Sequence, residues 1–289
     1  MDPAQGHPRR GGRPHMIRTV TSTGKYVSLV IASIVMLLPL GLILFGSFKT
    51  GQEFLATGPM TPPENWFNFE NYVTAFTRGN MLGAFGNTIF IFGAAIVGTI
   101  LIGAATAYAL DRFKFAGRST VLALFLLATL VPGVTTQVAT FQIINGLGLY
   151  DSRFALVLLF MGTDIISIYI FLQFIRAIPK SLDEAAMIEG AGHLRIFFQI
   201  ILPNLKPAIA TVVIIKGIAI YNEFYLPFLY LPSKELRPIS TTLFDFKGPY
   251  GSQWETISAG VIITIIPILV LFLFLQRYIY NGFTSGATK

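Results

Sequence analysis

The chain has 289 residues, of which 53% are hydrophobic and only 12% are charged, and it contains no cysteine. This composition is far too apolar for a water-soluble domain of that length, and the lack of cysteine excludes a disulfide framework and a thiolate metal site. The net charge of +7 does not indicate nucleic-acid binding, because the basic residues flank apolar segments and form no basic run interleaved with aromatic residues.

The first 25 residues are expected to form a disordered, basic tail on the cytoplasmic side. Residues 1–16 are rich in proline, glycine and arginine and cannot form a packed core. The junction between His15 and Met16 is also compatible with an artificial extension in front of a natural start at Met16. Residues 26–289 are expected to form a single membrane domain, since apolar segments recur along all of it.

Apolar segments recur at a length that suits membrane spans, which need about 20 residues each. They cover residues 26–47, 88–110, 119–141, 154–174, 207–228 and 257–276. We therefore predict an all-α integral membrane protein with six transmembrane helices. Pro132-Gly133 interrupts the third span and polar residues follow it. The interruption is either a kink that the bilayer tolerates or the wall of a water-filled cavity.

The distribution of lysine and arginine predicts the orientation in the membrane. With the N-terminus inside, the inner segments carry fourteen of these residues and the outer loops carry six. The positive-inside rule then places both termini and the loop of residues 177–206 in the cytoplasm. The loops of residues 49–86 and 231–255 are expected outside.

Within the cytoplasmic loop, a polar stretch has the pattern of two short helices joined by a turn. Ser181 and Glu184 have the spacing of a capping box at a helix start. Residues 182, 185, 186 and 189 fall on one face of that helix, which would carry a leucine, two alanines and a glutamate. Gly190-Ala191-Gly192 should end it, and residues 193–201 should form the second helix.

The same stretch resembles the EAA loop in the permease subunits of ABC importers, within the sugar-uptake branch of the maltose-permease type. The matching residues are Glu184, Ala185, Ala186, Gly190, Ile200, Leu202 and Pro203. The resemblance extends from about residue 26 to the end of the chain. It also includes Tyr221-Asn222-Glu223-Phe224, although Tyr221 stands where many relatives have tryptophan, and residues 133–137 are more polar than expected.

The resemblance implies the fold of a type I ABC importer permease in the cell membrane. It implies that the loop of residues 177–206 couples this chain to a separate ATPase, with Ser181 at the start of the coupling helix and Glu184 facing a basic residue of the ATPase. It also implies that a tail can reach between the ATPase subunits, through Asn281, Gly282, Thr284, Ser285 and Gly286. The implied partners are a second, homologous permease, an ATPase dimer, an extracellular sugar-binding protein and membrane lipid, with no nucleic acid.

Catalytic chemistry is not indicated. The sequence contains no Walker A motif, no hydrolase motif and no cluster of metal-ligand type. ATP and Mg²⁺ are therefore expected on the partner ATPase, and this chain is expected to hold no cofactor, no metal and no catalytic residue. The expected function is the permease subunit of an ATP-driven importer for a carbohydrate, with an oligosaccharide as the expected substrate; a polyol or an organic phosphate is the open alternative.

Polar residues within the third to fifth spans are the candidates for the substrate path, since lipid-facing positions would leave them unpaired. They are Gln137, Thr163, Asp164, Ser167, Asn222 and Glu223, with Tyr221 as an aromatic companion. Asp164 and Lys216 have three interpretations: a structural ion pair between spans, a role for Asp164 in lining a cavity, or side chains that reach the membrane interface.

Two other classes of function compete with this one. A secondary transporter or channel that works alone would also explain charged residues in the spans and a broken third span. A membrane enzyme is a third possibility, but it lacks a reactive group of residues. The polar cytoplasmic stretch favours the ATPase-coupled permease, because a carrier that works alone needs no docking helix.

Overall fold

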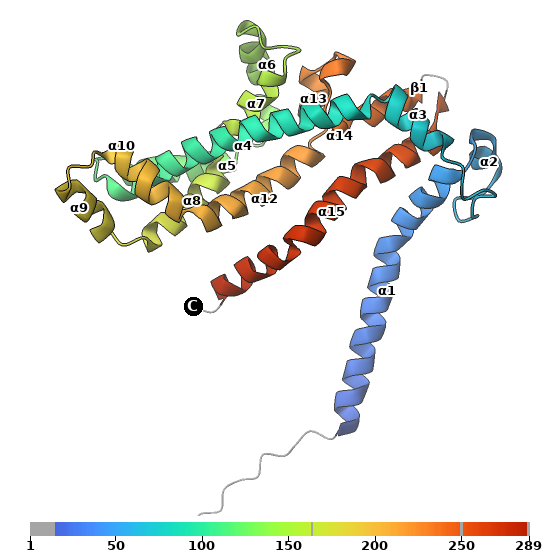
Figure 1. Cartoon of the computed structure of the whole chain (residues 1–289), viewed down its shortest axis with the longest axis horizontal. Coiled ribbons are helices and arrows are strands. Elements are labelled where there is room, and N and C mark those ends of the chain that lie inside the picture. Colours follow the sequence, from blue (N-terminus) through green and yellow to red (C-terminus); the bar gives the residue numbers. More distant parts are fainter. Residues whose placement is uncertain (1–14, 163, 249–250, 288–289) are drawn as a thin grey trace, which may run out of the picture.

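The computed structural model describes the backbone of residues 15–162, 164–248 and 251–287, and side chains between residues 24 and 273 with gaps at 163, 249, 250 and 271. The described part is almost entirely helical (Figure 1). Its longer helices are α1 (His15–Phe48), α4 (Met81–Arg112), α5 (Arg118–Thr129), α6 (Gln137–Gly146), α7 (Arg153–Met161), α8 (Ile165–Ala177), α12 (Lys206–Asn222) and α15 (Trp254–Ala287).

Shorter elements gather at the two ends of this arrangement. Toward one end lie α2 (Gly51–Ala56), α3 (Glu70–Arg78), α13 (Tyr225–Tyr230) and α14 (Ile239–Thr242), with the 3₁₀ turns η3 (Lys234–Leu236) and η4 (Leu243–Phe246) among the connections. A further 3₁₀ turn, η1 (Gly133–Thr136), lies between α5 and α6. A small antiparallel hairpin of β1 (Lys247–Gly248) and β2 (Gly251–Ser252) pairs Lys247 with Ser252. At the other end of α4 lie α9 (Ser181–Ile188), α10 (His193–Ile196), the π turn η2 (Phe197–Ile201) and α11 (Leu202–Asn204) (Figure 1).

Helix α4 is the centre of the packing, with α7, α8 and α12 against it. Its glycines allow this close approach. A Cβ atom added at Gly98 would lie 2.9 Å from the Met161 side chain of α7, and one added at Gly103 would lie 3.2 Å from the Phe171 ring of α8. Small residues in the second predicted span therefore serve helix packing, as they do in many membrane proteins.

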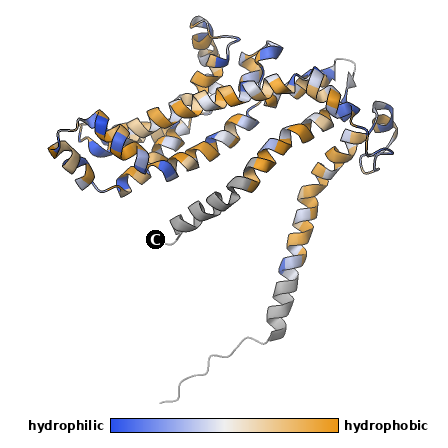
Figure 2. Cartoon of the chain, viewed as in Figure 1, coloured by the Kyte–Doolittle hydropathy of each residue, from blue (hydrophilic) through white to orange (hydrophobic). Residues whose placement is uncertain are grey.

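Helix α1 projects away from the other helices. It contacts α15 and α3 near its C-terminal end, and Figure 1 shows its remaining length standing apart. Every residue from 24 to 40 is exposed, and the helix is hydrophobic along this length (Figure 2). A side chain surface of this kind is stable in a bilayer but not in water.

Two helices are long and apolar enough to cross a membrane without a break, Gly24–Phe48 within α1 and Met81–Arg112. Three pairs of bent segments pass the same test together, which brings the number of spans to as many as five within the described residues. The third predicted span is one of these pairs, because the chain turns by 94° between residues 118–129 and 133–146. The fifth follows a bend of 72° between residues 193–204 and 206–222.

Two departures from the sequence-based expectation concern the ends of elements. Helix α1 begins at His15, so residues 15–25 are helical and the disordered tail cannot extend to residue 25; residues 1–14 lie outside the described part. The hairpin of β1 and β2 was not expected in an all-α chain. Glycine suits two of its positions, since Gly251 has a φ of 157° and a Cβ atom added at Gly248 would lie 2.9 Å from the Gly251 carbonyl oxygen.

Candidate functional site

Helix α9 ends in a glycine-dependent turn that sets the direction of α10. Gly190 has a φ of 84°, the left-handed conformation that glycine adopts most easily. The Gly190 amide donates to the Met187 carbonyl at 3.0 Å, and the Ala191 amide donates to the Ala186 carbonyl at 2.9 Å. These two bonds form a complete Schellman motif, so the prediction of a turn at residues 190–192 is confirmed.

The predicted capping box at Ser181 and Glu184 is wrong. The N-cap of α9 is Lys180, which is already in a helical conformation, and no side chain caps this end. The amide of Leu182 donates to the Pro179 carbonyl at 3.3 Å, so the helix is entered through a turn that starts at Pro179. Ser181 is therefore the first helical residue, where its hydroxyl cannot reach the amide of Glu184.

The residues of the predicted contact face of α9 point in different directions, some into the core and some to the surface. Ala186 is 9% exposed and packs in the hydrophobic core with residues of α4 and α8. Glu184 and Ala185 are exposed, and Ile188 is 88% exposed. A partner that contacts α9 thus meets Glu184, Ala185 and Ile188, whereas Ala186 must be small to fit against its own chain. We refer to Leu182, Glu184, Ala185, Ile188 and Leu194, all exposed, as the α9–α10 surface.

The second half of the stretch joins α10 to α12 through a π turn. The amide of Leu202 donates to the carbonyl of Phe197, five residues earlier. Pro203 follows in the first turn of α11, and it has no amide hydrogen to donate to the residue four positions before it. Ile200 and Leu202 pack against the core and Pro203 is exposed. Ile200, Leu202 and Pro203 therefore shape the bend that leads from α10 into α12.

Sequence analysis missed Asp183, the residue beside Glu184. Asp183 is 4% exposed, and its carboxylate pairs with Arg112 at the end of α4. A signal existed, since residues 183 and 184 are consecutive carboxylates on a helix and so point about 100° apart. Two such residues can therefore lie in different environments, one against the chain and one facing outward.

The described residues that were predicted to line a substrate path form separate hydrogen-bonded groups. Asp164, Ser167 and Lys216 form one cluster, with 3.2 Å between the Lys216 ammonium and the Asp164 carboxylate and a bond from the Ser167 hydroxyl to the same carboxylate. Gln137 donates to the Tyr230 hydroxyl at 2.9 Å in a second place. Burial raises the pKa of the Tyr230 phenol, which keeps it protonated.

The other path candidates lie near the end of α12. Tyr221 donates to the Thr264 carbonyl of α15 at 2.8 Å, and the Asn222 amide donates to its own helix. The carboxylate of Glu223 accepts from the amide of Leu226 at 3.1 Å. Thr163 lies outside the described residues. Of the three interpretations of Asp164 and Lys216, the ion pair between spans is the geometry observed.

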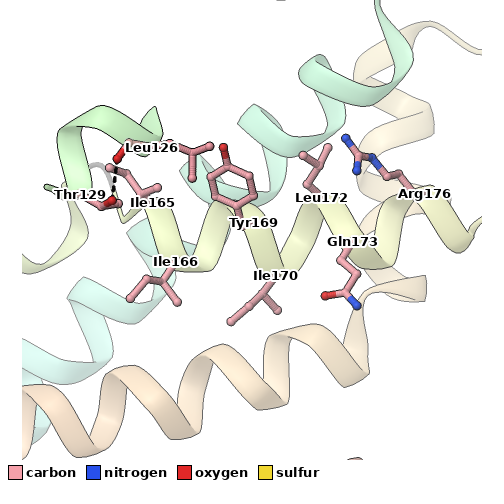
Figure 3. A pocket seen from close by; sticks show the side chains of 9 residues that line it. All are labelled: Leu126, Thr129, Ile165, Ile166, Tyr169, Ile170, Leu172, Gln173 and Arg176. Atoms are coloured by element: carbon pink, nitrogen blue, oxygen red, sulfur yellow. Dashed lines mark hydrogen bonds between the residues drawn. The ribbon is translucent and has the colours of Figure 1, made fainter. Parts of the chain in front are cut away.

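A groove of about 510 Å³ runs along α8 beside α5. Two residues of α5 and seven of α8 line it, and Figure 3 shows Tyr169 directed toward α5 and Arg176 at one end. The Tyr169 hydroxyl donates to the Leu122 carbonyl at 3.0 Å, which ties the two helices together. None of the described path candidates lines this groove.

The remaining predictions concern the tail and metal binding. Asn281, Gly282, Thr284, Ser285 and Gly286 belong to the last turns of α15, and their side chains lie outside the described part. Among the described residues, no group of three or more histidine, aspartate or glutamate residues is placed to hold a metal ion.

Comparisons with known proteins connect this geometry with a family. Residues 99–284 match the protein family described as "Binding-protein-dependent transport system inner membrane component". The chain is 29% identical over 264 residues to the diacetylchitobiose uptake system permease protein NgcG of Streptomyces coelicolor, with 90% of this chain and 87% of that protein covered. It is 32% identical over 271 residues to the galactooligosaccharides transport system permease protein GanQ of Bacillus subtilis, with 91% and 94% covered.

A solved structure shares the fold. A chain from the crystal structure of a bacterial ABC transporter involved in the import of the acidic polysaccharide alginate superposes with a TM-score of 0.78 at 20% identity. The superposition covers 95% of this chain and 99% of that one. The α9–α10 region lies inside residues 99–284, which match the family.

Proposed function

The chain belongs to the family of inner membrane components of binding-protein-dependent transport systems, and we propose that it is the permease subunit of an ATP-driven importer for an oligosaccharide. The similar proteins NgcG and GanQ are named as permeases for diacetylchitobiose and galactooligosaccharides, which supports an oligosaccharide as the substrate class. The hydrolysis of ATP, together with Mg²⁺, is assigned to a separate ATPase dimer. A second permease and an extracellular binding protein complete the proposed assembly.

The proposed topology has six spans with both termini in the cytoplasm. Its sixth span is α15, whose apolar part runs from Trp254 to Val270 among the residues with described side chains. The loops expected outside and the α9–α10 surface lie at opposite ends of α4 (Figure 1), which agrees with a single crossing between them. The excess of lysine and arginine on the α9 side supports a cytoplasmic position for that surface.

The observation that carries the proposal is the α9–α10 surface itself. A short helix at the end of the membrane domain exposes Leu182, Ala185 and Ile188 around one carboxylate, Glu184. An exposed apolar patch with a central charge is typical of a protein contact. A basic residue of the ATPase would pair with Glu184, because a charge-assisted bond surrounded by apolar contacts is both strong and directional. A carrier that works alone has no use for such a surface.

The experiment compares Glu184→Lys with a matched control, Lys180→Gln, at an exposed position beside the same helix. The ATPase subunits that purify with the permease and oligosaccharide uptake by the same cells are measured together. We expect Glu184→Lys to reach the membrane but to release the ATPase or to lose uptake, because it reverses the charge at the contact. Full ATPase retention and normal uptake would refute the coupling role and return a carrier that works alone as the better interpretation.

A further inference from the structure

Arg112 lies where three segments of the membrane domain meet behind the α9–α10 surface. Its Nε donates to the Asp183 carboxylate of α9 at 2.5 Å, and one terminal nitrogen pairs with Asp111 of α4 at 2.6 Å. The other terminal nitrogen donates to the carbonyl of Ile178, which follows the last turn of α8, at 2.9 Å. A single guanidinium therefore connects the ends of α4 and α8 to the first turn of α9.

The three charged side chains are buried. Arg112 is 7% exposed, Asp111 8% and Asp183 5%, measured on the side chains. Two further arginines, Arg118 and Arg176, lie 3.9 Å and 3.8 Å from Asp111 and are more exposed. One oxygen of Asp183 has no hydrogen-bond partner among the described residues. The cluster thus holds ionised groups away from water with incomplete pairing.

Such a cluster is an expensive way to stabilise a fold. Removing an ion from water costs several kcal/mol, and well-packed hydrophobic residues in place of a buried ion pair are often neutral or stabilising. Hydrophobic packing does not fix a direction, whereas the planar guanidinium donates its hydrogen bonds only in fixed directions. The arrangement of Arg112 is therefore better explained by the orientation that it imposes than by stability.

Helix α9 depends on this bond for its orientation. Among its eight residues, all of which are described, only Asp183 and Ala186 are buried. The contact of Ala186 is apolar and non-directional. Asp183 makes the directional contact, and its neighbour Glu184 is left exposed on the α9–α10 surface. The two consecutive carboxylates have different tasks, one facing inward and one outward.

We propose that Arg112 and Asp183 are positioning residues, and that their buried pair makes α9 move as one body with the ends of α4 and α8. Movement imposed on α9 by the ATPase then reaches the helices of the membrane domain without loss. This inference rests on the proposed coupling function. It goes beyond that function, because neither residue belongs to the surface that the ATPase would touch.

The test replaces the charged pair by hydrophobic residues of similar size, Arg112→Met with Asp183→Leu, in the complete assembly. A stabilising role predicts normal coupling, because the new side chains fill the same space and Asp111, which loses Arg112, keeps Arg118 and Arg176 at 3.9 Å and 3.8 Å. The positioning role predicts that the ATPase is retained but that the amount of oligosaccharide imported per ATP falls about tenfold, within the usual range of coupling between sites. Normal transport per ATP in this double variant would overturn the inference.

A distance measurement reports on position directly. The chain contains no cysteine, so spin labels attach at single engineered sites. Labels at Ala109→Cys on α4 and Glu189→Cys at the end of α9, both exposed positions, should give one narrow distance distribution with the native pair. We expect a broad distribution with the hydrophobic pair, and the milder Asp183→Asn serves if that double variant does not fold. An unchanged distribution would contradict the positioning role.

Two controls separate this inference from the coupling function on which it rests. Arg176→Gln removes a charge from the edge of the same cluster, where Arg176 is 54% exposed, and should leave both readouts unchanged. Glu184→Lys tests the contact with the ATPase. If Glu184→Lys uncouples transport and the hydrophobic pair does not, the positioning role fails alone. If Glu184→Lys is silent, the coupling function fails.

Discussion

Gly190 is the residue whose conformation most directly sets the angle between α9 and α10. Its φ of 84° costs a residue with a side chain about 1 to 2 kcal/mol. Space is not the obstacle, since a Cβ atom added there would meet nothing within 4 Å. The turn therefore constrains residue 190 through the backbone, and it does not constrain Gly192, which has a φ of −74° and is equally open.

The pair of variants Gly190→Ala and Gly192→Ala measures this difference. We expect Gly190→Ala to lower the free energy of unfolding by about 1 kcal/mol because of the left-handed conformation, and to weaken retention of the ATPase. Gly192→Ala should change neither. Thermal unfolding of the purified chain in detergent gives the stability, and equal effects of the two variants would show that the left-handed turn is not what residue 190 provides.

Single residues also show where sequence reasoning succeeds. The turn at residues 190–192 was predictable, because glycine has few other reasons to occur there. The capping box was not, because Pro179 and Lys180 start the helical turn before Ser181. A capping box does form between Thr50 and Glu53, where an extended N-cap precedes the helix. The residue pattern at the two places is similar, and only the preceding backbone differs.

At the scale of elements, the junction of α7 and α8 is held by groups from two other helices. The carbonyl of Phe160 accepts from Lys216 of α12 at 3.1 Å and from Thr99 of α4 at 3.4 Å. The Lys216 ammonium also meets the Asp164 carboxylate. Lys216 thus satisfies a carbonyl at the end of α7 and a carboxylate at the start of α8. The ion pair was one of three interpretations that the sequence left open, but no sequence pattern predicts that Lys216 and Thr99 share the Phe160 carbonyl.

Replacing only Lys216 should lower the free energy of unfolding more than replacing both Lys216 and Asp164. We expect Lys216→Met to destabilise the chain by about 1 to 3 kcal/mol, because the Asp164 carboxylate, 14% exposed, loses its cation and keeps only the Ser167 hydroxyl. Adding Asp164→Asn should recover much of that loss. The four-variant cycle, measured by chemical unfolding in detergent, gives the interaction energy. Additive losses would mean that the two residues act separately.

The orientation of the chain in the membrane can be tested on two single elements, α9 and η3. Single cysteines at Ser181→Cys on α9 and at Lys234→Cys on η3 can be probed with a membrane-impermeant thiol reagent, and both positions are exposed. Lys234 is preferable to Ser233, whose hydroxyl is bonded to Asp151. In intact cells we expect the cysteine at position 234 to react and that at position 181 to be protected. The reverse labelling pattern would invert the proposed topology.

The whole molecule has the form of one part of an assembly. Helix α1 exposes every residue from 24 to 40, and α9–α10 exposes an apolar surface at one end of the membrane domain. Apolar helical segments were predictable from the runs of hydrophobic residues, and as many as five spans pass the length and hydropathy test within the described residues. The bends within the spans, the projection of α1 and the cluster around Arg112 were not predictable. They depend on contacts between segments that lie far apart in the chain.

The central claim is that this chain imports an oligosaccharide only together with an ATPase. The most direct measurement follows uptake of a labelled galactooligosaccharide mixture into proteoliposomes that hold the purified assembly, with the binding protein on one side and ATP on the ATPase side. We expect accumulation against the concentration gradient that requires both ATP and the binding protein. Accumulation by this chain alone, without ATP, would contradict it.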